Sequence, residues 1–351
     1  MKKFRSITIV LFTIVLLSSC AKDNEEQVLE EESSGINEVA LLINESPSRV
    51  LRNQEINMRL VGTSGEDYTS MATFYVNGIE VESSTFSWES EGVYEVYAKY
   101  DKAGTITQTA SEMIEVFVPK RKILFEDYTG TWCAYCTHML ERIEYMKNDT
   151  EHFAYVSIHA GSADPYTFSN IQPLLEYFEV IFVPTGFTNR EYFFGFLDPY
   201  EYAIIGAGEE VNTSIAISSQ LDGNELSVNV DVISESGLSS NNKLVVMVLE
   251  SGLIYDQASA SNDDPESLYY QMGNPIPDFV HDNVLRACLT DLFGDSIPET
   301  PAFKEASSNF TYTVPNNYDL SKLSIIAFVT DEDNVAINTQ FADVNETKGF
   351  E

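Results

Sequence analysis

The stretch that decides the fold lies near the middle of the chain and reads Thr129-Gly130-Thr131-Trp132-Cys133-Ala134-Tyr135-Cys136. Strand-forming residues precede it, at Ile123-Leu124-Phe125, and apolar residues at helical spacing follow it, at Met139, Ile143 and Met146. Two cysteines separated by two residues at a strand-to-helix turn are typical of a redox-active pair. The sequence therefore predicts a reactive dithiol in an α/β unit.

The two cysteines are predicted to have different roles. Unpaired N–H groups and the helix macrodipole favour an anion at a helix start, which lowers the pKa of a cysteine there. Cys133 is therefore the predicted attacking thiolate. Cys136 lies about one turn further on, within reach of a mixed disulfide on Cys133, and is the predicted resolving thiol.

Two further features resemble the thioredoxin fold. Asp127 lies six residues before Cys133 on the predicted strand, and Val183-Pro184-Thr185 matches the segment with a cis proline. The resemblance implies that Asp127 exchanges a proton with Cys136 and that Pro184 faces the cysteines.

The same resemblance implies how a partner is held. Trp132, Val183 and Thr185 are the expected substrate-binding residues beside Pro184. The dipeptide between the cysteines is Ala134-Tyr135 rather than the Gly-Pro of thioredoxin itself, so the redox potential is left open.

Three segments together resemble the family of the 28-kilodalton outer-membrane protein: Glu126 to Cys133, Val183 to Arg190, and His281 to Ala287. The resemblance runs from about Lys122 to the C-terminus. It implies a lipid-anchored outer-membrane protein with a thioredoxin-like domain followed by a β-domain. An adhesin or receptor role is also implied for this family, so the substrate stays open.

Other interpretations of the cysteine pair remain. Cys133 and Cys136 could form a structural disulfide. A zinc site needs about four Cys or His ligands, and only His138 is close in sequence. A c-type haem site needs His directly after the second cysteine, where Thr137 stands. We expect no metal and no cofactor.

The N-terminus predicts an anchor. A basic start, an apolar run from Ile7 to Leu17 and the small residues before Cys20 follow the order of a secretory signal, and they resemble a lipoprotein signal. The prediction is cleavage before Cys20 and lipidation of its thiol, which tethers the chain to a membrane. A plain signal peptide with a chance cysteine is the alternative.

The net charge of the chain limits the kinds of partner that it can bind. Formal net charge is −35, and removing Lys2, Lys3 and Arg5 with the signal makes it −38. Such a field repels nucleic-acid phosphates, so no nucleic-acid partner is expected. The acidic stretch from Ala21 to Gly35 cannot bury enough apolar surface to fold and is predicted to be a flexible tether.

Alternating apolar residues predict β-structure on both sides of the cysteine unit. Asn77-Gly78 between two short strands is a hairpin signal, and the segment around Tyr94 resembles the tyrosine corner of immunoglobulin-like sandwiches. Within the cysteine unit, the sequence further predicts a strand through Gly186 to Phe196 and a helix over Asp198 to about Val211. A polar loop is predicted over Asp256 to Asp278.

The predicted fold is multidomain, α+β and α/β. Its parts are a lipoprotein signal peptide (1–19), an acidic flexible tether (20–36), an N-terminal immunoglobulin-like β-sandwich (37–119), a central thioredoxin-like α/β domain (120–211) and a C-terminal β-sandwich-like domain (212–351). The remaining cysteine, Cys288, is predicted to be a half-buried, inert thiol on the strand face of Arg286. Leu285, Ala287 and Leu289 are expected on the opposite face.

Two functions follow from these patterns. The first is an extracytoplasmic, membrane-anchored thiol–disulfide oxidoreductase acting on protein thiols or disulfides of the cell envelope. The second is a surface adhesion, receptor or binding module with an unknown surface partner, built on a non-catalytic thioredoxin-like scaffold. The expected location is the outer membrane, through the N-terminal lipid, facing either the periplasm or the surface.

Overall fold

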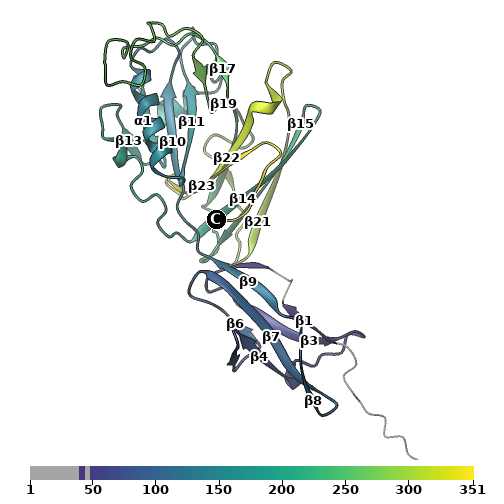
Figure 1. The fold of residues 1–351 in the computed structure, drawn as a ribbon. Coiled ribbons are helices and arrows are strands. Elements are labelled where there is room, and N and C mark those ends of the chain that lie inside the picture. Colours follow the sequence, from purple (N-terminus) through teal and green to yellow (C-terminus); the bar gives the residue numbers. More distant parts are fainter. Residues whose placement is uncertain (1–38, 44–47) are drawn as a thin grey trace, which may run out of the picture.

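The computed structural model describes residues 39–43 and 48–351, so the predicted signal peptide, Cys20 and the acidic tether lie outside the described residues. β-Strands dominate the described chain, and the first group of strands lies below the rest of the molecule in Figure 1. Within these ranges, no helix combines the length and the apolar character that crossing a membrane requires.

The first group of strands forms a sandwich of two sheets. One sheet has the order β1-β3-β6, with bounds Val39–Ile43, Ile56–Gly62 and Thr85–Phe86. The other has the order β2-β9-β7-β4-β5 with β8 beside β7, and its bounds are Arg49–Leu51, Glu112–Phe117, Gly92–Lys102, Ala72–Val76, Ile79–Val81 and Thr105–Gln108. A short 3₁₀ turn, η1 (Thr69–Met71), precedes β4. The inward side chains form one apolar core, as the alternation predicted.

Two local predictions in this sandwich are confirmed. Asn77 (φ 48°) and Gly78 (φ 78°) both adopt the left-handed conformation and join β4 to β5 in a tight turn. The Tyr94 hydroxyl donates a hydrogen bond of 3.0 Å to the carbonyl of Ser90, four residues upstream, and so ties a corner of the sandwich.

A nine-stranded sheet spans the middle and the end of the chain. Its main path is β13-β12-β10-β11-β19-β16-β22-β23, with β20 beside β16. The bounds in that order are Tyr192–Phe194, Thr185–Thr188, Ile123–Thr129, Phe153–His159, Val284–Cys288, Lys243–Glu250, Leu323–Thr330, Ala336–Asp343 and Asp295–Ser296. The pairs β10–β11 and β11–β19 are parallel and the others antiparallel. Strands from before and after residue 212 share this sheet. The domain boundary predicted at residue 212 stays a prediction.

A four-stranded sheet covers one side of this large sheet. Its order is β21-β15-β14-β24, with bounds Glu305–Thr313, Glu225–Ser234, Thr213–Asp222 and Thr347–Lys348. Apolar side chains of β14 and β15 pack against those of β16 and β22 in a shared core. The predicted second sandwich-like packing is therefore present. The remaining elements here are η3 (Leu320–Lys322) and the short pair β17 (Leu253–Ile254) and β18 (Val280–His281).

Within the described residues, α-helices are few: α1 (Cys136–Asp149) and α2 (Gln172–Tyr177). A third 3₁₀ turn, η2 (Tyr200–Tyr202), follows β13. The predicted helix over Asp198 to Val211 is wrong, because only η2 forms there. Gly206 (φ 83°) and Gly208 (φ 75°) adopt left-handed conformations that interrupt any helix.

The single strand predicted through Gly186 to Phe196 is also wrong. The segment is a hairpin of β12 and β13, turned by Asn189 (φ 53°) and Arg190 (φ 59°). Each turn residue is held by β10. The Asn189 side chain accepts a hydrogen bond from the Leu124 N–H, and the Arg190 guanidinium binds the buried carboxylate of Glu126. These contacts stabilise a backbone conformation that residues other than glycine rarely adopt.

Strand β19 departs from the predicted alternation at a β-bulge. Its register against β16 shifts between Val248 and Leu249, which leaves Arg286 as an extra residue. Leu285 therefore packs into one core, whereas Ala287 and Leu289 pack into the other. The prediction that these three share a face is wrong for this reason. Cys288 lies against the core of Leu285.

Candidate redox site

The two cysteines of the predicted site are joined in a disulfide. Cys133 and Cys136 have Cα atoms 5.4 Å apart, and Cys133 lies in the turn that connects β10 to α1. The helix begins at Cys136 rather than at the predicted Cys133. The Cys133 N–H donates to the Gly130 carbonyl and the Cys136 N–H to the Cys133 carbonyl, so the turn is closed before the helix starts. Cys136 is fully buried and Cys133 is 5% exposed, so Cys133 is the less buried residue of the pair.

Strand register places the predicted proline next to this turn. Val183-Pro184 is a cis peptide bond, and Pro184 directly precedes β12. Thr185 pairs with Tyr128 in the antiparallel β12–β10 ladder, so Pro184 lies level with Thr129, the last residue before the cysteine turn. The predicted cis proline is therefore present at the end of the sheet where the disulfide lies.

Asp127 is the buried carboxyl on the strand that leads to the disulfide. It is fully buried between Gly186 of β12 and Ser157 of β11, its two register partners. Neither carboxyl oxygen has a hydrogen-bond partner among the described residues. Burial raises the pKa of Asp127 to about 8, and the polar Thr129 side chain, which lies beyond regular hydrogen-bond geometry, offsets this only in part. This carboxyl is therefore able to hold and release a proton near neutral pH.

Trp132 has a fixed position beside the disulfide. Its ring is half exposed, and its Nε1 donates a hydrogen bond of 2.8 Å to the Ala160 carbonyl after β11. Gly161 (φ 105°) leaves the space for the ring, because a Cβ there would lie 2.5 Å from Nε1. The backbone after β11 therefore holds one wall of the site.

The surface around Cys133 is apolar. Tyr135, Ile181 and Phe182 are exposed, and the Tyr135 ring stacks on Phe196 at a centroid distance of 5.7 Å. Val183 is half-buried next to Phe182. By contrast, Thr185 is buried and its hydroxyl donates to the Phe182 carbonyl. The exposed residues Ile181 and Phe182 were not predicted, although they directly precede the predicted segment Val183-Pro184-Thr185.

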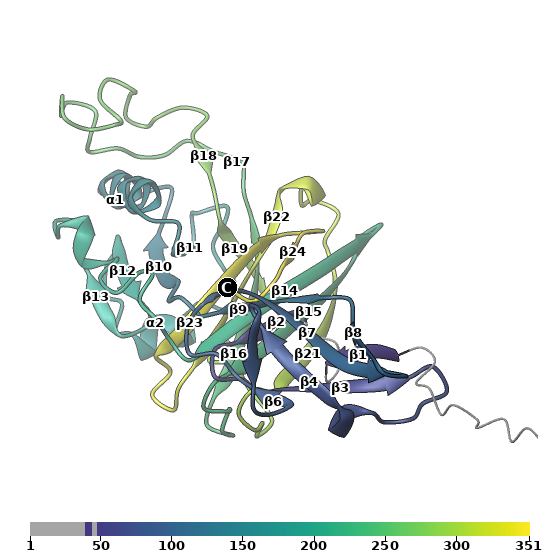
Figure 2. The ribbon, with the colours of Figure 1, turned by 60° about the horizontal axis from the view of Figure 1, so that its bottom comes forward.

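The long polar loop between β17 and β18 is an unpredicted part of the site. The segment from Gln257 to Ser261, which we call the strap, lies along the cysteine turn, and the loop reaches over α1 in Figure 2. The N–H groups of Ala258 and Ala260 donate to the carbonyls of Thr131 (2.8 Å) and Ala134 (2.7 Å). The sequence correctly predicted a loop at Asp256 to Asp278 but not its position.

Gln257 connects the strap to the turn most directly. Its side chain is buried, and its Nε2 donates to the carbonyls of Cys133 (3.0 Å) and Gly130 (3.3 Å). Ser261 continues the contact through its hydroxyl, which lies 2.9 Å from the Thr137 hydroxyl. These bonds hold the backbone on both sides of Cys133.

A buried histidine–aspartate pair supports the other side of the turn. His159 Nδ1 lies 3.0 Å from Asp164 Oδ2, and the same oxygen accepts a hydrogen bond of 2.6 Å from the Thr131 N–H. Burial alone would raise the pKa of Asp164, but the hydrogen bond and charge of His159 lower it below its usual range. His159 ends β11 and Asp164 follows five residues later, and neither residue was predicted as part of the site.

His281 lies beside this pair. Its ring centroid is 5.3 Å from that of His159, and burial lowers the pKa of His281 to about 4. His138, the histidine closest in sequence to the two cysteines, lies on α1, is half-buried and stacks on Tyr135 and Phe196. Among the described residues, no group of three or more His, Cys, Asp or Glu side chains is arranged to hold a metal ion.

Cys288 lies apart from the pair on β19. It is half-buried, and burial raises the pKa of its thiol to about 12. The predicted half-buried position is confirmed, and a thiol with this pKa is almost entirely protonated at neutral pH.

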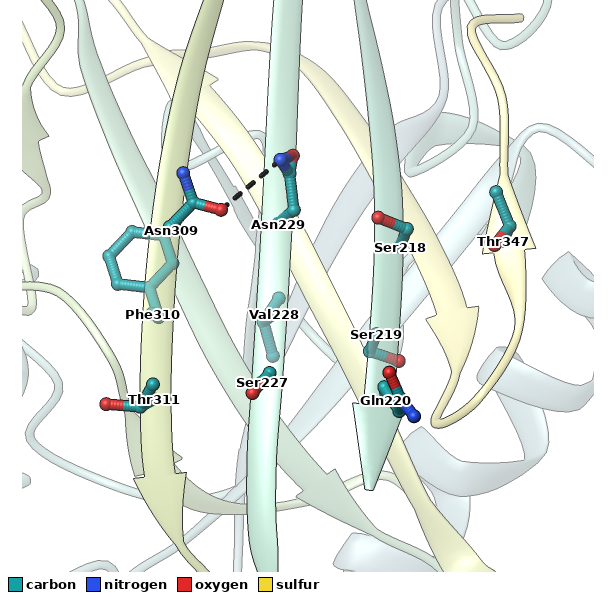
Figure 3. Close-up of a pocket in the computed structure, with 10 residues that line it drawn as sticks. All are labelled: Ser218, Ser219, Gln220, Ser227, Val228, Asn229, Asn309, Phe310, Thr311 and Thr347. Atoms are coloured by element: carbon teal, nitrogen blue, oxygen red, sulfur yellow. Dashed lines mark hydrogen bonds between the residues drawn. The ribbon is translucent and has the colours of Figure 1, made fainter. Parts of the chain in front are cut away.

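A shallow hollow of about 450 Å³ lies elsewhere, on the outer face of the four-stranded sheet (Figure 3). Its lining is almost entirely hydroxyl and amide side chains, and Asn229 donates to Asn309 across β15 and β21. None of the side chains drawn there is charged, and none is a predicted site residue. The predicted redox residues of β10 and β12 therefore lie on the other sheet.

Two structures of β-glucosidase from Kluyveromyces marxianus, one in complex with glucose, align with 11% identity and a TM-score of 0.19. The alignments cover 85% and 84% of this chain and 45% of each glucosidase chain, so the chain spans just under half of their length. No curated protein matches the sequence.

The sequence model of one family does match. The family is described as Outer membrane protein Omp28, and the match covers residues 172–348, just over half of the 351-residue chain. The matched range includes the cis proline and the strap and begins after the cysteine pair. The match supports a location in the outer membrane of the cell envelope, as predicted. The chain belongs to the Omp28 outer membrane protein family.

Proposed function

We propose that this outer-membrane protein exchanges thiols and disulfides with other proteins through Cys133 and Cys136, and that residues 120–211 form a thioredoxin-like domain. The domain assignment is supported by the parallel pair β10–β11, the helix α1 after β10 and the antiparallel β12 that follows a cis proline. The predicted roles of Cys133, Cys136, Asp127 and Pro184 are part of this proposal.

The observation that carries the proposal is the state of the Asp127 carboxyl. A disulfide that only braces the fold has no use for a buried carboxyl without hydrogen bonds, and such a group costs folding free energy. Its position on the strand leading into the cysteine turn gives it a use, because a resolving thiol must lose a proton as it attacks and regain one as it leaves.

The exchange is balanced in protons and electrons. In the reduced protein, the Cys133 thiolate attacks one sulfur of a partner disulfide and expels the first partner thiolate. Cys136 then gives its proton to Asp127 and attacks the Cys133 sulfur, which forms the disulfide described here and releases the second partner thiolate. Two electrons pass to the partner, and each step is reversible.

The exposed apolar surface supports a polypeptide partner. Trp132 and Tyr135 flank Cys133 in the chain, Phe182 lies just before the cis-proline segment, and all three are exposed. Aromatic side chains of this kind bind extended chains with little loss of conformational entropy. Val183 and Pro184 would contact the partner backbone next to Cys133.

Reduction of insulin by the full chain in the presence of dithiothreitol tests this function. The wild-type chain should accelerate precipitation of the insulin B chain, and the Cys133→Ala variant should leave only the uncatalysed rate. A Cys288→Ala variant is the matched control and should act like the wild type. Equal rates for wild type and Cys133→Ala would contradict the proposal.

A second candidate function is a surface binding module, favoured by the hollow of Figure 3. Its hydroxyl and amide groups are uncharged, although the chain has a net charge of −35. An uncharged face can approach an anionic or neutral surface with little repulsion. Binding to an envelope or host surface should then survive Cys133→Ser and be lost in Asn309→Glu. Loss in Cys133→Ser and retention in Asn309→Glu would reject this candidate.

A further inference from the structure

A second cavity lies at the end of β10 that is opposite to the disulfide. It has a volume of about 580 Å³ and is bounded by Arg121, just before β10, by the β12–β13 hairpin and by the segment after η2. The seven residues of β10 span about 20 Å, so the cavity and the cysteine turn are separate places. None of the predicted redox residues lines it.

Exposed aromatic and aliphatic side chains line part of the cavity wall. Tyr192, Phe193, Tyr202 and Ile205 line it, and each keeps more than half of its surface exposed. β13, which carries two of them, is the free edge strand of the large sheet (Figure 1). A cavity of this volume with an apolar wall and a few polar groups is typical of small-molecule sites. Exposed apolar residues gathered in this way are uncommon unless something covers them.

Arg121 is the residue of the cavity wall whose hydrogen bonding is incomplete. Its Nε is buried and has no hydrogen-bond partner, and its guanidinium forms no ion pair with any described residue. Acidic residues outnumber basic ones by 55 to 20 in this chain, so an unpaired guanidinium is not due to a shortage of carboxylates. Arg121 is half-buried as a residue, and its buried Nε–H without a partner costs free energy that a bound anion would recover.

The backbone around Arg121 is firmly held. The Arg121 N–H donates to the Glu209 carbonyl (2.7 Å), and the Gly208 N–H donates to the Arg121 carbonyl (2.9 Å). These two bonds fix the start of β10 to the segment after η2. The fold therefore fixes the Arg121 backbone beside the cavity.

Two carboxylates restrict the charge of a ligand. Asp198 and Glu209 also line the cavity, and neither forms an ion pair with Arg121. The Asp198 carboxylate accepts a hydrogen bond of 2.8 Å from the Gly195 N–H, which holds it in place. A ligand with several negative charges would be repelled by them, whereas a single anionic group could reach Arg121.

We propose that this cavity binds a small ring-bearing monocarboxylate. The flat face of the ring packs against the aromatic wall of Tyr192 and Tyr202, and the carboxylate accepts hydrogen bonds from the Arg121 guanidinium. Aromatic acids and acidic sugars share this chemistry. The binding does not depend on the disulfide.

Isothermal titration calorimetry with the full chain tests the site. The probes are phenylacetate and glucuronate, each compared with its neutral counterpart, phenylacetamide and glucose. At least one acid should bind with a Kd below about 1 mM, and its neutral counterpart should bind at least about tenfold more weakly because it lacks the charge-assisted bonds. Absence of binding by both acids up to about 10 mM would overturn the proposal.

Variants locate the binding. Arg121→Gln should weaken the acid at least about tenfold and leave the neutral counterpart unchanged, whereas Tyr202→Ala should weaken both. Arg59→Gln, which removes an exposed arginine of the first sandwich, is the charge-matched control and should bind like the wild type. Unchanged affinity in Arg121→Gln would contradict the site. Arg121→Gln should keep full insulin-reducing activity, so failure here is distinguishable from failure of the redox function.

Discussion

The Asp127 carboxyl, buried without a hydrogen bond, makes the stability of the fold depend on pH. Its folded pKa is raised to about 8 from an ordinary value of 3.8, so between these values the folded state holds a proton that the unfolded state has lost. Stability should therefore fall as pH rises through this window and level off above it.

Replacing Asp127 by Asn should remove this dependence. The variant should be more stable than the wild type by a few kcal/mol at pH 8 and nearly equal to it at pH 4, because only the ionised carboxylate is costly. Urea unfolding of the oxidised chain at several pH values measures the difference. An equal gain at pH 4 and pH 8 would mean that the carboxyl does not titrate in this range.

Gln257 allows a second test at the same scale. Gln257→Ala removes the donor to the carbonyls of Gly130 and Cys133, and it should destabilise the chain by about 1–3 kcal/mol because buried carbonyls lose their partner. It should also speed reduction of the disulfide by dithiothreitol, since the turn is less restrained. Gln172→Ala, which removes only an exposed hydrogen bond to Glu176 on α2, is the control and should change neither. An unchanged reduction rate in Gln257→Ala would show that the strap does not restrain the turn.

Sequence patterns predicted the cysteine pair and its neighbours Asp127 and Pro184 better than the distant residues whose hydrogen bonds hold the cysteine turn. The cysteine pair, the buried Asp127 and the cis Pro184 follow local patterns that one strand and one turn express. Gln257 and Asp164 could not be found in this way, because their contacts with the cysteine turn join segments far apart in the chain. Such contacts depend on the tertiary fold and leave no periodic signal.

Among the elements, the β12–β13 hairpin depends on a buried ion pair with β10. Arg190 donates to Glu126 Oε1 at 2.9 and 3.1 Å, and both side chains are fully buried. Arg190→Met should destabilise the chain by about 3–5 kcal/mol, since Glu126 would remain as an uncompensated buried charge.

The double variant distinguishes charge from packing. Glu126→Gln combined with Arg190→Met should recover a large part of the loss, because no charge is left unpaired. Thermal unfolding of the wild type, the single variant and the double variant measures this. A double variant as unstable as Arg190→Met would assign the loss to packing instead.

Element boundaries were the weaker part of the sequence-based description. Strands with clear alternation, such as those around Asn77-Gly78, formed as predicted. The helix expected at Asp198 to Val211 failed at its two glycines, and the bulge at Arg286 moved Leu285 to the opposite core. A bulge adds one residue to a strand without changing the apolar pattern, so alternation alone cannot reveal it.

Across the whole molecule, the first sandwich contacts the rest of the chain at a small polar and aromatic junction. Arg52 of the first sandwich pairs with Glu210 and Glu235, and the Phe117 ring stacks on that of Phe350. The connecting segment Lys120-Arg121-Lys122 runs through this junction.

Arg52→Ala should loosen the junction and expose the connecting segment. Trypsin should then cut after Lys120, Arg121 or Lys122 faster than in the wild type, because cleavage follows local opening. Arg59→Ala, which breaks an exposed pair within the first sandwich, should not change the rate at these bonds. Mass spectrometry of the early fragments identifies the sites, and equal cleavage in all three chains would show that Arg52 does not hold the junction.

One sheet joins the middle and C-terminal segments of the chain. β19 and β16 extend the sheet that begins with β10 and β11, and the domain boundary predicted after residue 211 stays a prediction. The parallel contact between β11 and β19 links residues more than a hundred positions apart, and a local pattern does not contain such pairing.

The reduction potential of the Cys133–Cys136 pair, measured by equilibration with glutathione or dithiothreitol buffers, tests the central claim most directly. A pair that exchanges with partner proteins should have a potential between about −270 and −120 mV, the range of thiol–disulfide oxidoreductases. A potential below about −300 mV would identify a structural bridge and contradict the proposed exchange.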